Sequence, residues 1–351
     1  MFGAGAFCFF MSELSKQLEG MSISSRNGIE IQSSSFSIAL DPKRASNCDY
    51  TFVSHAHIDH VHVPNGKSKL VASEETKKLA KLRGYDLGRT DEGSSAVYLV
   101  DSGHILGAKA VVIKDRLLYT GDLCGRDRGF LKGFKGIKCE TLIMETTYGR
   151  PHYVFPNIDD IASRVNRFIA RCFDECRPVV LTGYPLGKAQ VISYLFGSWD
   201  PIYLHESVYS MNQCHIDFGV GLRNLACYEP TKSFDSKLTK GPWVLIAPNF
   251  SAKSHFISSL KRDYNVAVAS FSGWALDSRF RFMQNATESF PLSDHSDFNE
   301  LVEFAKYCNP SMIYTVHGFA KEFAAHLRSI GFEAEPLGES LGQSRLTNFD
   351  H

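Results

Sequence analysis

The first half of the chain alternates short runs of apolar and β-branched residues with polar turns, a pattern typical of short strands joined by tight connections. One helical pattern interrupts this region and is expected to begin after Ser73, which can cap it, and to end near Leu82. Glu74 and Glu75 in the first turn are favoured there by the helix dipole. The expected strands are residues 29–32, 36–40, 50–53, 70–72, 96–100, 110–113, 117–120 and 141–144.

After residue 149 the pattern changes to longer helical periods that alternate with continuous apolar runs. Such alternation favours a parallel sheet with helices on both faces, so we expect an α/β fold. The expected helices are residues 158–173, 187–196, 298–307 and 321–330, and the expected strands are 178–181, 202–204, 243–247, 266–270 and 312–316.

Length and composition narrow the class of protein. A chain of 351 residues has room for about two domains. Its formal net charge of zero provides no overall field toward nucleic acid, so such binding would depend on local patches. The nine cysteines contain no CxxC pair, which is typical of reduced thiols. No run approaches the roughly 18 apolar residues of a membrane helix, and residues 2–11 lack the features of a signal peptide. We therefore expect a cytoplasmic protein without membrane contact.

The densest chemistry lies in residues 54–60, Ser-His-Ala-His-Ile-Asp-His, directly after the expected strand 50–53. In extended backbone His55 and His57 project to the same side, and a following turn can bring Asp59 and His60 to a neighbouring point. Three imidazoles and a carboxylate suit zinc and similar cations. Because one ion cannot comfortably use all four side chains, the segment predicts two metal ions.

Further candidate residues stand just after other β runs. They are His104, Asp122, Glu145, His295 and His317. Taken singly, such residues are more often structural, but sites of α/β proteins gather at strand ends. Their joint placement therefore favours one shared site.

A basic stretch follows Asp122 and contains Arg126, Arg128 and Lys132, with Phe130 and Phe134 interleaved. It could bind phosphates and stack a base, or it could be a solvated loop with a buried Phe pair. Lys188 lies at an expected helix start, where backbone N–H groups favour phosphate. A simple packing motif with a solvated lysine explains Lys188 nearly as well.

These motifs together resemble the metallo-β-lactamase superfamily and, within it, the β-CASP nucleases, over about residues 28 to 335. The motifs are HAHIDH (55–60), GHILGA (103–108), TGD (120–122), METTYG (144–149), SDHSD (293–297) and VHG (316–318). Glu145 followed after about 150 residues by His295 is specific for β-CASP enzymes. GYPLGKAQ (183–190) is similar to their Leu-Gly-Arg-Ala-Gln signature, with Lys188 in place of arginine. SGW (272–274) and IYLH (202–205) are most similar to the ligase-associated DNA exonuclease branch, which is also named for likeness to an mRNA 3'-end processing factor.

The resemblance implies an αββα metallo-β-lactamase sandwich built from residues 22–150 and 288–351. An α/β β-CASP domain, residues 151–287, would be inserted between Glu145 and His295 and cover the metals. Residues 1–21 are expected to be an N-terminal extension outside the core.

The resemblance also implies two zinc ions per chain, with Mn²⁺ as an alternative metal. The first set of ligands would be His55, His57, His104 and Asp122, and the second Asp59, His60, Asp122 and His317. Asp122 would then bridge the ions, which together can bind a phosphodiester and lower the pKa of the attacking water toward ~7.

The implied catalytic residues are His295, Glu145 and Asp59. His295 would protonate the leaving oxygen, and Glu145 would orient it and favour its protonated form. Asp294 and Asp297 are expected to be capping or supporting groups rather than ligands. Arg126, Arg128, Lys132 and Lys188 are the candidates for contact with nucleic acid.

The function implied by the resemblance is a zinc-dependent nuclease on single-stranded DNA or RNA, first of all a DNA exonuclease that works in repair beside an ATP-dependent DNA ligase. A first alternative is a β-CASP ribonuclease in RNA 3'-end processing or decay. A second is a hydrolase of small esters or thioesters with the same fold, and a third is a nucleic-acid-binding module without catalysis. A histidine at position 317 fits both the RNA-directed and the ligase-associated groups, so it does not decide between DNA and RNA.

Overall fold

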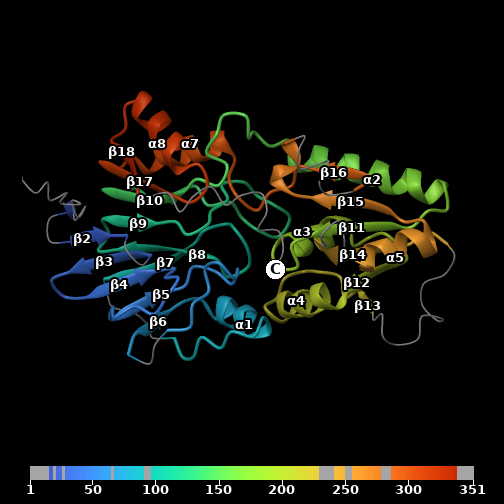
Figure 1. Ribbon diagram of the computed structural model, residues 1–351, viewed down its shortest axis with the longest axis horizontal. Coiled ribbons are helices and arrows are strands. Elements are labelled where there is room, and N and C mark those ends of the chain that lie inside the picture. The colour runs from blue at the N-terminus through green and yellow to red at the C-terminus, as the bar shows by residue number, and fades with distance from the viewer. Residues whose placement is uncertain are drawn as a thin grey trace, which may run out of the picture.

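The computed structural model describes residues 16–18, 21–25, 28–64, 67–90, 96–228, 241–249, 255–277 and 286–337. These residues form three six-stranded sheets. Figure 1 shows the first two sheets in one half of the molecule and the third sheet in the other half. In the described part of the chain, no helix is long and apolar enough to cross a membrane.

The first two sheets face each other and share an apolar core. Ile31, Ile38 and Phe52 of the first sheet pack with Val111 and Ile143 of the second. In order across it, the first sheet is β1 (Lys16–Leu18), β2 (Met21–Ser24), β3 (Ile29–Ser33), β4 (Ser37–Leu40), β5 (Tyr50–Phe52) and β6 (Lys69–Val71). The second is β18 (Ala334–Pro336), β17 (Met312–Val316), β10 (Thr141–Glu145), β9 (Leu117–Tyr119), β8 (Lys109–Ile113) and β7 (Val97–Asp101).

Helices cover the outer faces of this pair of sheets. The helices α7 (Phe298–Cys308) and α8 (Ala320–Ser329) pack on the second sheet, and their Leu301 and Phe323 share one apolar cluster with Leu142 of that sheet. On the other side, α1 (Glu74–Leu82) contributes Leu79 to a cluster with Leu70 of the first sheet. The order helix, sheet, sheet, helix is the predicted αββα sandwich.

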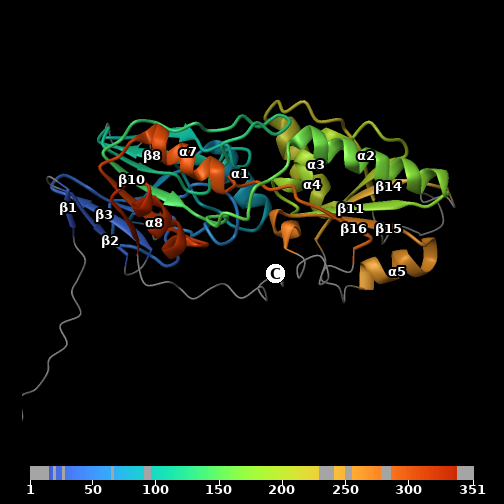
Figure 2. The same cartoon turned by 90° about the horizontal axis from the view of Figure 1, so that it is seen from above.

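The third sheet is all parallel and is inserted into the second, because β10 and β17 pair although the third sheet lies between them in sequence. Figure 2 shows α2, α3 and α4 on one of its faces and α5 on the other. Both faces are therefore buried, and every residue of the strand Val179–Gly183 is buried. Its order is β13 (Ala226–Tyr228), β12 (Ile202–His205), β14 (Val244–Pro248), β11 (Val179–Gly183), β15 (Ala267–Phe271) and β16 (Glu288–Phe290). Its helices are α2 (Ile158–Asp174), α3 (Lys188–Phe196), α4 (Glu206–Asp217) and α5 (His255–Tyr264), with a short 3₁₀ helix η1 (Gly273–Leu276) before β16.

The predicted fold class is confirmed, and α4 and α5 are the helices that the sequence analysis did not predict. In α4 the buried positions include Asn212 and His215, so polar residues interrupt the apolar stripe that marks a helix. The predicted domain limits stay a prediction. Most of the expected extension, residues 1–15, 19 and 20, lies outside the described residues, whereas β1 and Met21 within that stretch belong to the first sheet.

The predicted cap of α1 gives a test of the sandwich's stability. The Ser73 hydroxyl accepts a hydrogen bond from the Thr76 backbone N–H (3.0 Å) and lies 2.6 Å from the Gly107 carbonyl oxygen. We expect Ser73→Ala to lower the free energy of unfolding by about 1 kcal/mol, because a helix N–H loses its acceptor. Urea denaturation measures this loss. The control, Ser163→Ala on the exposed face of α2, should stay within about 0.5 kcal/mol of the wild type, and equal stability of both variants would contradict the capping role.

Candidate metal centre

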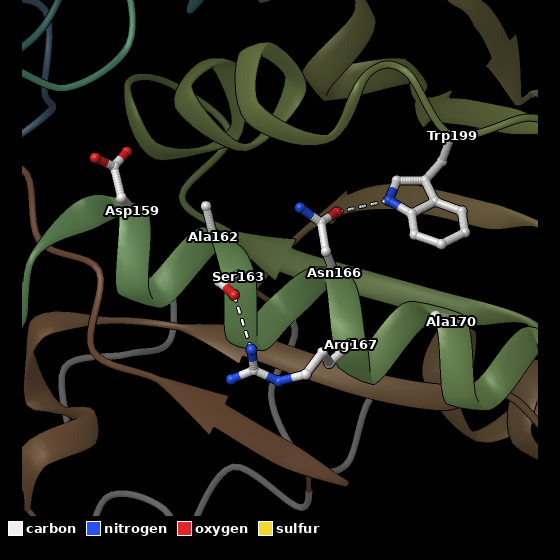
Figure 3. Close-up of a pocket in the computed structure, with 7 residues that line it drawn as sticks. All are labelled: Asp159, Ala162, Ser163, Asn166, Arg167, Ala170 and Trp199. Carbon is white, nitrogen blue, oxygen red and sulfur yellow. Dashed lines mark hydrogen bonds between the residues drawn. The ribbon is translucent and has the colours of Figure 1, made fainter.

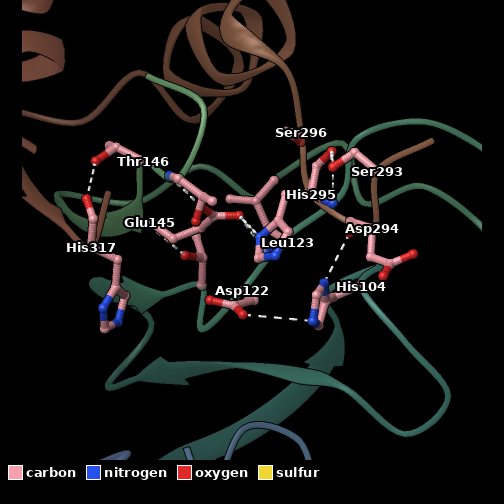
Figure 4. A network of polar contacts seen from close by, with 12 residues as sticks. His104, Asp122, Leu123, Glu145, Thr146, Ser293, Asp294, His295, Ser296 and His317 are labelled. Carbon is pink, nitrogen blue, oxygen red and sulfur yellow. Dashed lines mark hydrogen bonds and ion pairs between the residues drawn. The ribbon is translucent and has the colours of Figure 1, made fainter. Parts of the chain in front are cut away.

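The second sheet brings predicted metal ligands to one place because the four strands that carry them run in the same direction. The strands β9, β10 and β17 pair in parallel. The strand β7 runs in the same direction as these three, because β8 lies between β7 and β9 and is antiparallel to both. His104, Asp122, Glu145 and His317 follow or end these strands, so their side chains gather at one edge of the sheet (Figure 4). His55, His57 and His60 reach the same edge from the turn after β5.

His55, His57, His104 and Asp122 form a compact group of potential ligands. His57 Nδ1 lies 3.1 Å from the Nε2 atoms of both His55 and His104. Asp122 Oδ2 lies 3.5 Å from His55 Nε2 and 3.6 Å from His104 Nε2. Zinc bonds of 2.0–2.1 Å in a tetrahedron place the ligand atoms about 3.3 Å apart. The four donor atoms therefore have the spacing of a tetrahedral zinc site.

The outer nitrogen of each histidine in this group has an acceptor that fixes its proton. His57 Nε2 donates to the Leu186 carbonyl oxygen at 3.1 Å, and His104 Nδ1 donates to the Asp294 carbonyl oxygen at 2.9 Å. His55 Nδ1 lies 2.9 Å from the Ser54 hydroxyl oxygen. With these nitrogens protonated, the three inner nitrogens keep their lone pairs for a metal.

The second predicted set converges less closely. His60 Nε2 lies 3.5 Å from Asp122 Oδ1 and 3.7 Å from Asp59 Oδ2. The His317 ring centre is 5.4 Å from that of His60, and the Asp59 side chain is 78% exposed. The two oxygens of Asp122 thus face the two sets separately, as a bridging carboxylate requires. The second set does not form a compact group like the first, since His317 and Asp59 lie at its margin.

The protonation of the centre suits metal binding. Burial lowers the pKa of His55 and His104 well below the usual range and that of His57 to about 4, so these rings are neutral ligands at neutral pH. Burial also lowers the pKa of His60, but the carboxylates of Asp122 and Asp41 outweigh it and raise that pKa to about 10. A cation bound at His60 would therefore displace a proton.

Glu145 and His295 form a buried pair beside the first group. Glu145 is inaccessible to solvent, and its Oε1 accepts a hydrogen bond from His295 Nδ1 at 2.9 Å. Burial lowers the pKa of His295, but Glu145 and Asp122 outweigh that effect and raise it to about 9. His295 is therefore charged at neutral pH and has a proton to give, while its ring lies 4.6 Å from that of His104.

Asp297 and Asp294 have the supporting roles expected for them. Asp297 is the N-cap of α7, where it accepts a hydrogen bond from the Glu300 backbone N–H at 3.0 Å. Asp294 is buried, and its carboxylate binds Arg128 Nη1 (3.0 Å) and Lys188 Nζ (2.8 Å). Neither aspartate belongs to a compact group of ligands among the described residues.

The four basic residues predicted to contact nucleic acid do not lie together on the surface. Arg128 and Lys188 are buried, and their ion pairs with Asp294 count against direct contact with phosphate. Arg126 is paired with Glu300, and its guanidinium stacks on Phe155. Lys132 is the one of the four with a largely exposed side chain, 82%, and it pairs with Asp127 at 2.8 Å. Spacing in sequence alone could not distinguish these environments.

Asp41 supports the candidate site by hydrogen bonds and was not identified in the sequence analysis. It is buried after β4, and its Oδ2 accepts hydrogen bonds from His60 Nδ1 (2.9 Å), the Ser54 hydroxyl (2.6 Å) and the Tyr119 hydroxyl (2.9 Å). It thereby orients His60 and, through Ser54, His55. The signal that could have found it is an Asp-Pro pair directly after an expected strand.

A surface hollow of about 620 Å³ lies along α2 beside Trp199 (Figure 3). There the Trp199 ring N–H donates to Asn166 Oδ1 at 2.9 Å, and Arg167 donates to the Ser163 hydroxyl. The hollow is lined by none of the potential metal ligands, which gather instead at the strand ends.

Part of the chain matches a model of a known protein family. Residues 284–335 match the family model of the Zn-dependent metallo-hydrolase RNA specificity domain. That segment includes His295 and His317.

Two curated relatives and one solved structure are similar to the chain. It is 33% identical over 304 residues to a "Probable DNA ligase" of Opitutus terrae, covering 82% of this chain and 29% of that protein. It is 24% identical over 247 residues to "DNA ligase 6" of Arabidopsis thaliana, covering 64% of this chain and 17% of that protein. The chain thus spans less than a third of the length of these relatives. A crystal structure of a protein of unknown function from Enterococcus faecalis V583 has a similar fold, with a TM-score of 0.57, 14% identity and coverage of 91% of this chain and 95% of that one.

The geometry predicts how single substitutions change the metal content. We expect His104→Ala to lose an ion from the first set, Asp59→Asn to lose one from the second, and Asp122→Ala to lose both, because its two oxygens face the two sets. Elemental analysis after saturation with zinc and gel filtration measures the stoichiometry.

His152→Ala, which removes an exposed histidine outside both sets, is the matched control for these variants. An Asp122→Ala protein that keeps the full wild-type zinc content would exclude Asp122 as the shared ligand.

Proposed function

We propose that this chain is a zinc-dependent nuclease that hydrolyses phosphodiester bonds. It has the metallo-β-lactamase-type α/β fold and contains a Zn-dependent metallo-hydrolase RNA specificity domain. The leading substrate is single-stranded DNA, which the enzyme would shorten from an end during repair that finishes with ligation. We further propose that it uses two zinc ions and that residues 151–287 are a β-CASP domain.

One observation carries this proposal: a proton donor stands beside the carboxylate shared by the two sets of metal ligands. Asp122, Glu145 and His295 form a second compact group, with potential ligand atoms within 4.8 Å of one another. A hydrolase of small esters with a good leaving group has little need of a charged imidazole at this point. A phosphodiester has a poor leaving alkoxide, and protonation by a positioned acid is typically worth ~10²–10⁴-fold.

The residues of the chain have separate tasks in this proposal. When bound, the zinc ions would supply Lewis acidity toward the phosphodiester and generate the nucleophile from water. His295 would give its Nε2 proton to the leaving oxygen while Nδ1 stays bonded to Glu145. Glu145 is itself held by the backbone N–H groups of Thr147 (2.8 Å) and Leu123 (3.2 Å), so the acid has a fixed orientation.

The names of the two relatives support DNA as the substrate. Both matching proteins are named DNA ligases, and this chain corresponds to a minor part of each. A nuclease segment joined to a protein so named would remove damaged or unpaired ends before sealing. We propose an ATP-dependent DNA ligase as the partner of this nuclease.

RNA is the second candidate substrate, and a specific observation favours it. The family model that matches residues 284–335 is described as an RNA specificity domain. Processing or decay of RNA would use the same metal ligands, His295 and Glu145, so the choice of nucleic acid does not alter the proposed chemistry.

The proposed substrate is tested by cleavage of end-labelled DNA and RNA strands of identical sequence, each labelled at the 5' end or at the 3' end. We expect zinc-dependent shortening of the DNA strand from one end. Asp59→Asn is the matched inactive control, and it should reduce the rate at least about 10²-fold because it removes a proposed metal ligand.

The outcomes of this assay are distinct. Faster cleavage of RNA would move the enzyme to RNA processing and keep the assignment of the site. If neither strand is cut by protein that holds zinc, phosphodiester hydrolysis is wrong and a different substrate class must be sought.

The proposed acid is tested separately. We expect His295→Ala to keep its zinc content and to lose about 10²–10⁴-fold in the cleavage rate, because the leaving oxygen loses its proton donor. Quantified cleavage at saturating substrate, together with elemental analysis of the same sample, measures both properties. A His295→Ala enzyme that works at the wild-type rate would remove His295 from the acid role.

A further inference from the structure

The connection between β11 and α3 belongs to the third sheet, yet three consecutive residues at its end lie against the first metal set or its supports. These residues are Leu186, Gly187 and the first residue of α3, Lys188, which together we call the β11–α3 turn. The first set itself comes entirely from the first two sheets. The contacts therefore join two parts of the fold at the candidate centre.

Leu186 contributes its backbone carbonyl oxygen, which accepts the hydrogen bond from His57 Nε2 at 3.1 Å. This bond places the proton of His57 on the outer nitrogen and leaves Nδ1 facing His55 and His104. The carbonyl of the third sheet thus fixes both the tautomer and the ring orientation of a metal ligand.

Gly187 allows the turn to approach closely. Its backbone has a φ of +93°, and a Cβ atom there would lie 2.4 Å from Ile105 Cγ2, a distance that real contacts do not reach. Ile105 follows His104 directly and is itself buried. Only glycine gives both the backbone conformation and the space that this approach needs.

Lys188 acts on the metal ligand His104 through one intermediate residue, Asp294. Its Nζ donates to Asp294 Oδ2 at 2.8 Å and to the Leu292 carbonyl oxygen at 3.1 Å. The side chains of Lys188 and Asp294 are each only 4% exposed, so this ion pair is shielded from solvent. The carbonyl oxygen of the same Asp294 accepts the hydrogen bond from His104 Nδ1 at 2.9 Å (Figure 4).

We propose that the β11–α3 turn is a positioning element of the first metal set, in which Leu186 holds His57 and Lys188 holds His104 through Asp294. Lys188 is then a positioning residue rather than a contact for nucleic acid. This inference rests on the proposed function in one respect, namely that the first set binds zinc. The third sheet then does more than cover the substrate, because the outer hydrogen bonds of the first metal set are incomplete without it.

The test is the zinc affinity of Lys188→Met, in which the side chain keeps its length but loses its charge and its donors. Loss of an outer partner of a ligating histidine typically costs 10–100-fold in metal affinity, so we expect a loss of that size for one of the two equivalents. Competition with a chromophoric chelator measures each dissociation constant. Lys188→Arg, which keeps charge and donors, should recover most of the affinity, and Lys306→Met on the exposed side of α7 should bind zinc like the wild type.

Two backgrounds identify the ion that is affected. In Asp59→Asn, where the first set is left, Lys188→Met should weaken the remaining ion. In His104→Ala, where the second set is left, Lys188→Met should change nothing further. Weakening in the His104→Ala background, or wild-type affinity in folded Lys188→Met, would overturn the proposal.

Gly187→Ala provides an independent variant if Lys188→Met does not fold, as judged by circular dichroism and thermal unfolding. It should weaken the same ion, because the added Cβ must move the turn away from Ile105. Folded Gly187→Ala with wild-type affinity for both ions would equally overturn the proposal. Zinc titration requires no substrate, so a protein that cleaves no nucleic acid but loses affinity in these variants would refute the proposed function and support this inference.

Discussion

The centre of this protein depends on a buried carboxylate, Asp122, placed among imidazoles from two sheets. Its Oδ2 faces His55 and His104, and its Oδ1 faces His60. Burial raises the pKa of Asp122 to about 6, so near neutral pH the group carries a charge that its surroundings stabilise incompletely. A metal cation would satisfy this charge more fully than the imidazolium of His60 does, and the neutral rings of His55 and His104 supply further donors.

Outer hydrogen bonds explain why so many polar groups are tolerated at the meeting point of the sheets. Asp41 binds His60 and Ser54, Asp294 binds His104 through its backbone, and Glu145 binds His295. Each bond to a histidine assigns a proton to its outer nitrogen. The inner nitrogen of His104 keeps its lone pair, whereas those of His60 and His295 carry a proton, which His60 would release to a bound cation. The outer hydrogen bonds therefore orient the inner atoms of the site. Substitution of an outer partner should change metal binding before it changes the fold.

The sequence predicted the parts of this arrangement that local pattern controls. Strand ends, the Ser73 cap and the dense HAHIDH segment are local signals. The match of residues 284–335 to the Zn-dependent metallo-hydrolase RNA specificity domain agrees with the resemblance carried by the motifs around His295 and His317. Burial, in contrast, is decided by tertiary contacts. Arg128 and Lys188 are of the residue types that bind phosphate at protein surfaces, yet each is buried in an ion pair with Asp294. Asp41 was missed because its partner His60 lies 19 residues away in the chain.

The cost of enclosing two cations indicates what the Asp294 cluster does. Burying a lysine and an arginine around one carboxylate is expensive, and an apolar core of equal volume would often be as stable. Such a cluster is better explained by geometry than by stability: charged hydrogen bonds fix atoms in a direction that apolar contacts do not. Asp294 is adjacent to His295 and bonded to His104, so fixing it fixes the proton donor and a metal ligand together. Lys188 begins α3 beside the third sheet, and Arg128 lies in the connection between β9 and β10 of the second sheet. Both parts of the fold therefore determine the position of Asp294.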